Sequence, residues 1–176
     1  NNVTSVLEDR AGALWVGTWG GGVNRLSQGR FVQGLGPGNS PVFVLGLLEG
    51  AQGAIWAGSD YDGGVFRLQA GKLHHYGTRQ GLPGSAIRVL CQDQASNLWV
   101  GASSGLYRRQ GGRFVAFGRR HGMGEPVVRA LYADHAGNLW VGTESGLWRV
   151  HGESVSKFTQ AQGLSSKRVI AIYQDG

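Results

Sequence analysis

The stretch Asn138-Leu139-Trp140-Val141-Gly142-Thr143 occurs, with small changes, four times in this chain of 176 residues. The earlier copies begin at Ala13, Ala54 and Asn97, and the tryptophans of successive copies are 41, 43 and 41 residues apart. A fixed period in this range is typical of repeat architectures. Residues shared by all copies are therefore expected to build the scaffold, and function is expected where the copies differ.

Each copy contains four short segments rich in β-branched and aromatic residues, separated by turn residues. The repeated stretch is the second strand of each copy. The first strands are expected at residues 3–8, 42–49, 87–92 and 127–133, with a fifth at 169–174. The third strands are expected at 22–26, 64–68, 105–109 and 146–150, and the fourth near 30–32, 72–76, 113–117 and 154–158.

The period and the short loops predict an all-β fold, a β-propeller with four-stranded antiparallel blades. The 32 glycines and 4 prolines suit many tight turns and exclude a helix-rich fold. The chain is interpreted as one propeller segment, part of a larger propeller or of one completed by an oligomer, with the inner strand of a fifth blade. The blades are expected at about 1–36, 37–77, 78–118 and 119–160, and the linker and first strand of the fifth at 161–176.

An aspartate opens the turn after the first strand in three copies, at Asp9, Asp93 and Asp134, and Gly50 takes this place in the second copy. A short Asp side chain accepts hydrogen bonds from backbone amides two residues ahead, which stabilises the turn. These acids are therefore interpreted as structural and not as an active site.

Charge and composition exclude several classes of function. The net charge of +6 arises from scattered basic residues without one dense run, so no nucleic-acid partner is expected. The one cysteine, Cys91, cannot form an internal disulfide and is expected to be buried and inert. The chain has no apolar run long enough for a spanning helix, so any membrane contact is expected only through other parts of the parent protein.

The repeated pattern resembles the two-component regulator propeller repeat, and His135-Ala136-Gly137-Asn138-Leu139-Trp140-Val141-Gly142-Thr143 is its best match. The resemblance covers essentially the whole chain. It implies an extracytoplasmic sensor region of a bacterial membrane receptor, usually a hybrid histidine kinase and sometimes a diguanylate cyclase. Blades of that family commonly form seven-bladed propellers, often in tandem, and several relatives respond to oligosaccharides. The transmitter, transmembrane helix and sandwich domain of such receptors are not among these residues.

The turns between second and third strands, together with the linkers between blades, should lie on one face around the central channel. Trp19 and Tyr61 are candidates to stack on a sugar ring, and Asp60, Asp62 and Glu144 to accept its hydroxyl hydrogen bonds. The remaining candidates from these turns and linkers are Ser103, Arg119, Arg120 and His121. The basic linker residues would favour an anionic ligand if clustered. The alternative is that all of these are ordinary solvated turn residues.

No metal, cofactor or catalytic residue is predicted. The segment Asp60-Tyr61-Asp62-Gly63 lacks the later bidentate acid of a calcium loop. His74 and His75 lie on an expected outer strand without the spacing of metal ligands. No nucleophile elbow and no phosphate-binding loop are present.

The sequence therefore predicts a non-enzymatic, ligand-sensing propeller segment of a periplasmic receptor region, with a small molecule or oligosaccharide as ligand. Further blades or a second copy of the chain are the expected protein partners. One alternative is a propeller enzyme similar to streptogramin lyases, which need a catalytic histidine, for which only His121 and His135 are candidates. The other is a structural module that assembles with itself.

Overall fold

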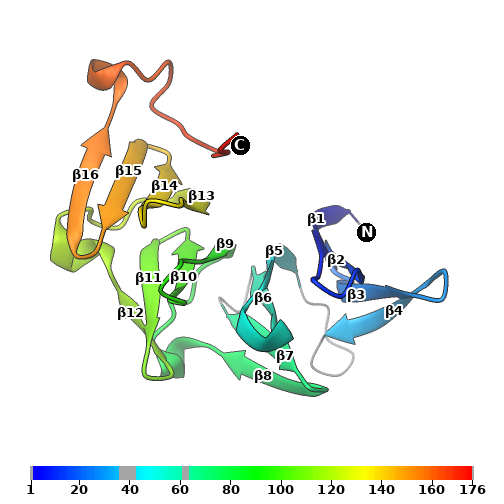
Figure 1. The fold of residues 1–176 in the computed structure, drawn as a ribbon. Helices are drawn as coiled ribbons and strands as arrows, with labels where there is room; N and C mark the ends of the chain where they lie inside the picture. The colour runs from blue at the N-terminus through cyan, green and yellow to red at the C-terminus, as the bar shows by residue number, and fades with distance from the viewer. Residues whose placement is uncertain (1, 36–42, 61–63, 176) are drawn as a thin grey trace. The chain divides into compact units, whose positions relative to one another are not determined.

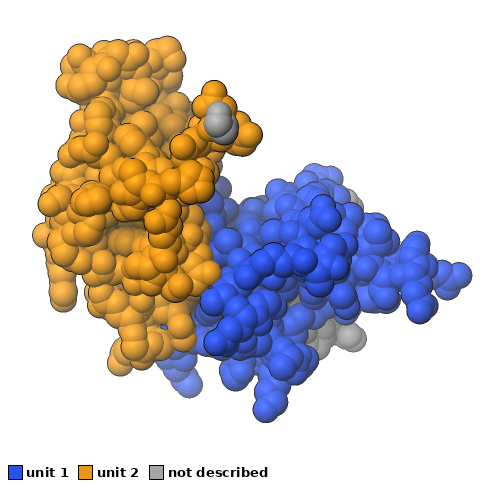
Figure 2. All heavy atoms as spheres, in the orientation of Figure 1, with its two compact units in different colours: residues 1–90 blue, residues 91–176 orange. Residues whose placement is uncertain are grey.

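The computed structural model describes residues 2–35, 43–60 and 64–175 of the chain. The chain divides into two compact units, Asn1–Leu90 and Cys91–Gly176, which are considered separately below (Figure 2).

The described residues form four antiparallel sheets of four strands, and within each sheet the strands follow one another in chain order (Figure 1). The first sheet contains β1 (Val3–Glu8), β2 (Leu14–Thr18), β3 (Gly22–Ser27) and β4 (Arg30–Leu35). The second contains β5 (Val44–Glu49), β6 (Ile55–Ser59), β7 (Val65–Gln69) and β8 (Lys72–Tyr76). The third contains β9 (Ile87–Gln92), β10 (Leu98–Ala102), β11 (Gly105–Gln110) and β12 (Arg113–Ala116). The fourth contains β13 (Val128–Ala133), β14 (Leu139–Thr143), β15 (Gly146–His151) and β16 (Ser154–Phe158).

Short 3₁₀ helices occupy turns and linkers: η1 (Ala51–Gly53), η2 (Thr78–Gln80), η3 (Gly118–His121) and η4 (Gln160–Gln162). None of the helices in the described part of the chain is long and apolar enough to cross a membrane. The predicted all-β fold with four-stranded blades is confirmed.

The predicted fifth inner strand at residues 169–174 is not a strand within the described residues. The segment lies against the edge of the fourth sheet, where the Val169 amide donates a 2.9 Å hydrogen bond to the Thr143 carbonyl. A strand requires a ladder of such bonds with a neighbouring strand. No described segment pairs with it in that way, so residues 169–174 do not form the predicted strand.

The repeated aspartates and tryptophans are hydrogen-bonded to each other. The Trp15 Nε1–H group donates to Asp9 Oδ2 at 2.8 Å, and the pairs Trp99–Asp93 and Trp140–Asp134 have the same bond at 2.7 Å. Each aspartate also accepts the backbone amide four residues ahead. Asp9 and Asp134 in addition accept the predicted amide two residues ahead. The first and second strands of these blades are thereby joined at one end by a buried or half-buried indole.

An arginine covers the tryptophan on the neighbouring strand. Arg25, Arg67 and Arg108 pair in register with Trp15, Trp56 and Trp99 and place their guanidinium carbons 5.4–5.5 Å from the ring centroids. The arginine of each Gly-x-x-Arg segment is therefore part of the scaffold through a cation–π contact.

The glycines of three Trp-x-Gly stretches permit the close approach of the segment that begins the next copy. A Cβ atom on Gly58 would lie 2.9 Å from the Ile87 carbonyl oxygen, and one on Gly142 would lie 2.8 Å from the Val169 carbonyl oxygen. Gly17 has the same relationship to Val44, with 2.7 Å to its Cγ1 atom. Glycine is thus required here for space and not for an unusual backbone conformation.

Apolar side chains fill the seam between the first and second sheets, inside the first unit. Trp15, Val23, Val44, Ile55, Ala57 and Phe66 form one buried cluster there. In the second unit Trp99, Val100, Val128 and Val141 are likewise buried. Trp15 therefore packs between two blades, as predicted for this position of the repeat.

Candidate functional site

Trp19 and Asp60, two predicted ligand-binding residues, are brought together through Phe43 in the first unit. The rings of Trp19 and Phe43 meet edge to face with centroids 5.0 Å apart, and their backbones form an isolated bridge. The Asp60 amide donates a 2.8 Å hydrogen bond to the Phe43 carbonyl. Trp19 keeps 41% of its surface exposed, so an aromatic face and a half-buried acid lie beside the same residue.

The local structure explains why these positions come together. Trp19, Asp60 and Glu144 occupy the same position of the repeat, directly after the second strand. Each amide donates to the carbonyl of the residue before the first strand of its own blade: Asn2, Phe43 and Val127, at 2.8, 2.8 and 3.3 Å. The scaffold therefore fixes the backbone at this variable position, and the side-chain contact differs from copy to copy.

Glu144 is the corresponding residue in the second unit, and two arginines hold its carboxylate. Arg129 of β13 donates from Nε to Glu144 Oε1 at 2.6 Å, and Arg168 Nε lies 3.0 Å from Glu144 Oε2. Arg168 precedes residue 169 just as Phe43 precedes β5, so Trp19 and Glu144 each contact the residue before the next inner segment. Ser103 has the same place in the β10–β11 turn.

The basic residues of the linker after β12 do not form one cluster. Arg119 forms a bidentate ion pair with Glu125, with Nε 2.6 Å from Oε1 and Nη2 2.9 Å from Oε2. Hydrogen bonding and charge from Glu125 raise the pKa of the exposed Arg119. Arg120 is exposed and lines a small cavity with His121.

His121 points toward Glu153 in the turn between β15 and β16, with 2.6 Å from Nε2 to Oε2. Glu144, another candidate residue of the predicted site, is instead paired with Arg129 and Arg168. Tyr61 and Asp62, the other two predicted site residues, lie outside the described residues.

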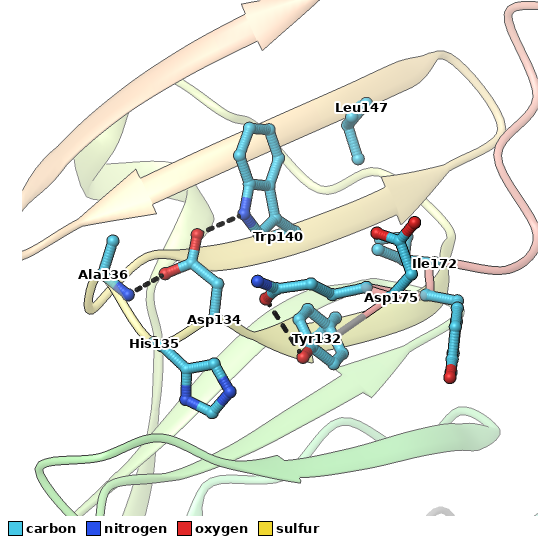
Figure 3. Close-up of a pocket in the computed structure, with 10 residues that line it drawn as sticks. Tyr132, Asp134, His135, Ala136, Trp140, Leu147, Ile172 and Asp175 are labelled. Carbon is cyan, nitrogen blue, oxygen red and sulfur yellow. Dashed lines mark hydrogen bonds between the residues drawn. The ribbon is translucent and has the colours of Figure 1, made fainter.

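A second hollow lies at the open side of the fourth sheet, where Tyr132, Trp140, Leu147 and Ile172 line a groove of about 560 Å³ (Figure 3). Trp140 is half-buried there, whereas Trp15, Trp56 and Trp99 at the same repeat position are 7%, 5% and 3% exposed. The groove is therefore interpreted as the packing face of a blade and not as a ligand pocket.

The described residues give no support for metal or nucleophilic chemistry. No group of three or more His, Cys, Asp or Glu side chains among them could hold a metal ion. Burial raises the pKa of the Cys91 thiol to about 11, so its nucleophilic thiolate form is suppressed at neutral pH. His121 and His135, the histidines of the enzyme alternative, line different hollows.

Sequence reasoning missed Phe43 and Arg129, and it considered Arg168 only as one of the basic linker residues. Phe43 and Arg168 share a repeat position, one residue before the inner segment, and that position also varies between copies. This variation between copies is the sequence signal that marks the position as a candidate.

Comparison with known proteins supports the resemblance of these repeats to a known repeat family. Residues 1–20, 81–104 and 122–145 match the family model of the two component regulator propeller. The resemblance inferred from the sequence is thereby confirmed for three stretches. No protein of the curated set matches the chain.

Solved structures share the fold. The extracellular domain of a putative hybrid two-component system from B. thetaiotaomicron is 25% identical with a TM-score of 0.83, over 96% of this chain and 24% of that one. Virginiamycin B lyase from Staphylococcus aureus is 17% identical with a TM-score of 0.74, over 96% of this chain and 58% of that one. The chain thus spans about a quarter of the sensor domain and more than half of the lyase. The family match and the sensor domain point to a non-enzymatic sensor segment, and the lyase shares the fold alone.

Proposed function

We propose that this chain is a ligand-binding segment of the extracytoplasmic, periplasmic part of a bacterial signal-transduction receptor, and that its ligand is a carbohydrate. The observation that carries the proposal is the half-exposed ring of Trp19, held against Phe43 beside Asp60. An aromatic face stacks on the C–H surface of a sugar, and a neighbouring carboxylate accepts hydrogen bonds from its hydroxyl groups.

The family match and the similarity to an extracellular domain of a two-component system support the receptor context. An output domain, such as a kinase, would belong to other parts of the receptor. Binding itself requires no catalytic group, which agrees with the structural roles of Asp9, Asp93 and Asp134.

A glycan array probed with the purified chain tests this function. We expect retention of at least one class of oligosaccharide by the wild type and loss of that signal in Trp19→Ala. Phe31→Ala is the matched control, because Phe31 is an aromatic residue of the same unit with 57% exposure on the outer strand β4. An array with no specific signal, or an equal signal for Trp19→Ala and the wild type, would contradict the proposal.

The groove beside Trp140 supports a further blade as protein partner, supplied by flanking sequence or by a second copy of the chain. In the other three copies this tryptophan position is buried. Size-exclusion chromatography with light scattering distinguishes the two sources: a dimer indicates a second copy, and a stable monomer at high concentration excludes it.

A further inference from the structure

The imidazole of His121 lies between two hydrogen-bond acceptors at the end of η3. Its Nδ1 atom is 2.7 Å from the Phe117 carbonyl oxygen, and its Nε2 atom is 2.6 Å from Glu153 Oε2. Stacking on the Phe117 ring, with centroids 4.0 Å apart and 12° between the planes, fixes the orientation of the imidazole. A neutral imidazole carries one N–H group and can satisfy only one of these acceptors, whereas the imidazolium satisfies both.

Arg108 holds the carboxylate that faces His121. Its Nη2 atom donates to Glu153 Oε1 at 2.8 Å, so the two carboxylate oxygens are divided between Arg108 and His121. The guanidinium itself lies over the rings of Trp99 and Phe117. Hydrogen bonding from Arg108, only partly opposed by burial, lowers the pKa of Glu153, and His121 adds to this effect. Glu153 therefore remains an ionised acceptor in weakly acidic solution.

The charged groups around His121 come from three elements. Arg120 of η3 lines the same cavity of about 170 Å³, Arg108 belongs to β11, and Glu153 belongs to the β15–β16 turn. Arg119 is engaged by Glu125. The two nearby cations disfavour a second proton on the imidazole, but Arg108 is already neutralised by Glu153 and Arg120 is exposed and screened by solvent.

We propose that His121 and Glu153 form a proton-dependent clasp between η3 and the β15–β16 turn, closed when the imidazole donates from both nitrogens and weakened when it loses one proton. The clasp joins the linker after the third sheet to the fourth sheet, inside the second unit. It would make the mobility of the linker that carries Arg119 and Arg120 depend on the acidity of the surrounding medium. This regulation goes beyond ligand binding and does not depend on the identity of the ligand.

The two partners set the pH range of the clasp. The imidazole that carries both protons donates to Glu153 and to the Phe117 carbonyl at once, and loss of one proton leaves a single donor for these two acceptors. The pKa of Glu153 lies below its ordinary value of 4.5, so the carboxylate contributes above that value and its contribution is lost as pH falls through the lowered pKa. The clasp is therefore expected to hold more tightly in weakly acidic than in alkaline solution.

Nitrogen-15 NMR of the histidine side chains in the wild-type chain tests the proposal without any substitution. At pH 6.0 we expect proton-bearing signals from both Nδ1 and Nε2 of His121. A single protonated nitrogen, with the other unprotonated at this pH, would overturn the proposal.

Amide hydrogen exchange provides the second test. The Met123 amide, bonded to the Gly118 carbonyl at 3.0 Å, reports on the linker. After correction for intrinsic rates, we expect exchange to be about two- to fivefold slower at pH 6.0 than at pH 8.5, the range of an exposed ion pair. His121→Gln, whose amide donates to Glu153 at every pH, should abolish this difference.

Two further variants sharpen the exchange test. In Glu153→Gln the amide can donate to a neutral imidazole while its oxygen still accepts from Arg108, so the pH difference should also vanish. His151→Gln is the control, because His151 is an exposed histidine of the same unit whose Nδ1 lies 3.1 Å from Asn138 Oδ1. It should retain the wild-type response. Equal pH dependence in the wild type and His121→Gln would contradict the clasp.

Discussion

The ring of Trp19 packs edge to face against the ring of Phe43, with their centroids 5.0 Å apart, although 24 residues separate them in the chain. Trp19 follows the second strand of one blade, and Phe43 precedes the first strand of the next. Glu144 and Arg168 repeat this relationship with an ion pair in place of an aromatic contact. The scaffold thus presents pairs of variable residues at equivalent places.

Phe43→Ala should weaken carbohydrate binding without unfolding the chain, because it removes the edge contact that orients Trp19. An aromatic pair contributes about 0.5–1.5 kcal/mol, so the dissociation constant should rise about two- to tenfold. Titration followed by tryptophan fluorescence measures the effect. Phe31→Ala, elsewhere in the same unit, should leave the constant unchanged, and an equal loss of affinity in both variants would argue against an oriented Trp19.

Asp134→Asn should destabilise the fourth blade by about 1–3 kcal/mol at pH 7, because the new amide group faces donors of Trp140 and Asn138 in place of a charged acceptor. Burial raises the pKa of Asp134, but hydrogen bonds from Asn138, Trp140 and two backbone amides outweigh burial and lower it to about 2. The carboxylate therefore stabilises the fold above pH 4 and loses this effect as pH falls toward 2.

Urea unfolding from pH 2 to 7 measures the difference between the wild type and Asp134→Asn, which should shrink below pH 4. Asp175→Asn is the control, since Asp175 has the same position in the unfinished fifth copy. A difference that stays constant down to pH 2 would show that the carboxylate is not the source of the stability.

Gly50→Ala should destabilise the second blade by about 1–3 kcal/mol, the usual range for an overpacked site. Gly50 stands where the other copies have aspartate, and a Cβ atom there would lie 2.6 Å from Trp56 Nε1. The indole occupies the space of the missing side chain. Thermal unfolding measures the change, and Gly84→Ala, whose Cβ would have only an ordinary 3.9 Å contact, serves as control. Equal melting temperatures for the two variants would refute this packing argument.

Gly142→Ala should displace the segment at residues 169–174 from the fourth sheet, because the new methyl group would meet the Val169 carbonyl oxygen at 2.8 Å. The Val169 amide, bonded to Thr143, should then exchange its hydrogen faster while the amides of β15 remain protected. Unchanged protection of Val169 would mean that the glycine is not needed for this approach.

The strands could be predicted well because the two features that specify them, apolar strand residues and turn glycines, act locally. Alternating apolar residues and turn glycines specify β1, β9 and β8 at their observed bounds. The segment at 169–174 has the same pattern, but a strand also requires a partner, which no local pattern supplies. The bond between Trp140 and Asp134 was missed for a similar reason: the spacing of six residues brings the indole to the turn only once the two strands are paired.

The candidate site was predicted only in part. The turns suggested Trp19 and Glu144, but their partners Phe43 and Arg168 come from the segment that begins the next copy and depend on how one blade follows another. His121 was grouped with the linker arginines, yet its ring stacks on Phe117 and reaches Glu153, a contact that depends on the bend of η3.

Hydrogen exchange of the chain with and without a bound oligosaccharide locates the ligand most directly. We predict added protection of the Trp19 and Asp60 amides, which donate to the carbonyls of Asn2 and Phe43, and of neighbouring amides in these turns. Protection confined to the turns that follow the first strands, around Gly12 and Gly53, would place the ligand at those turns and contradict binding beside Trp19 and Asp60.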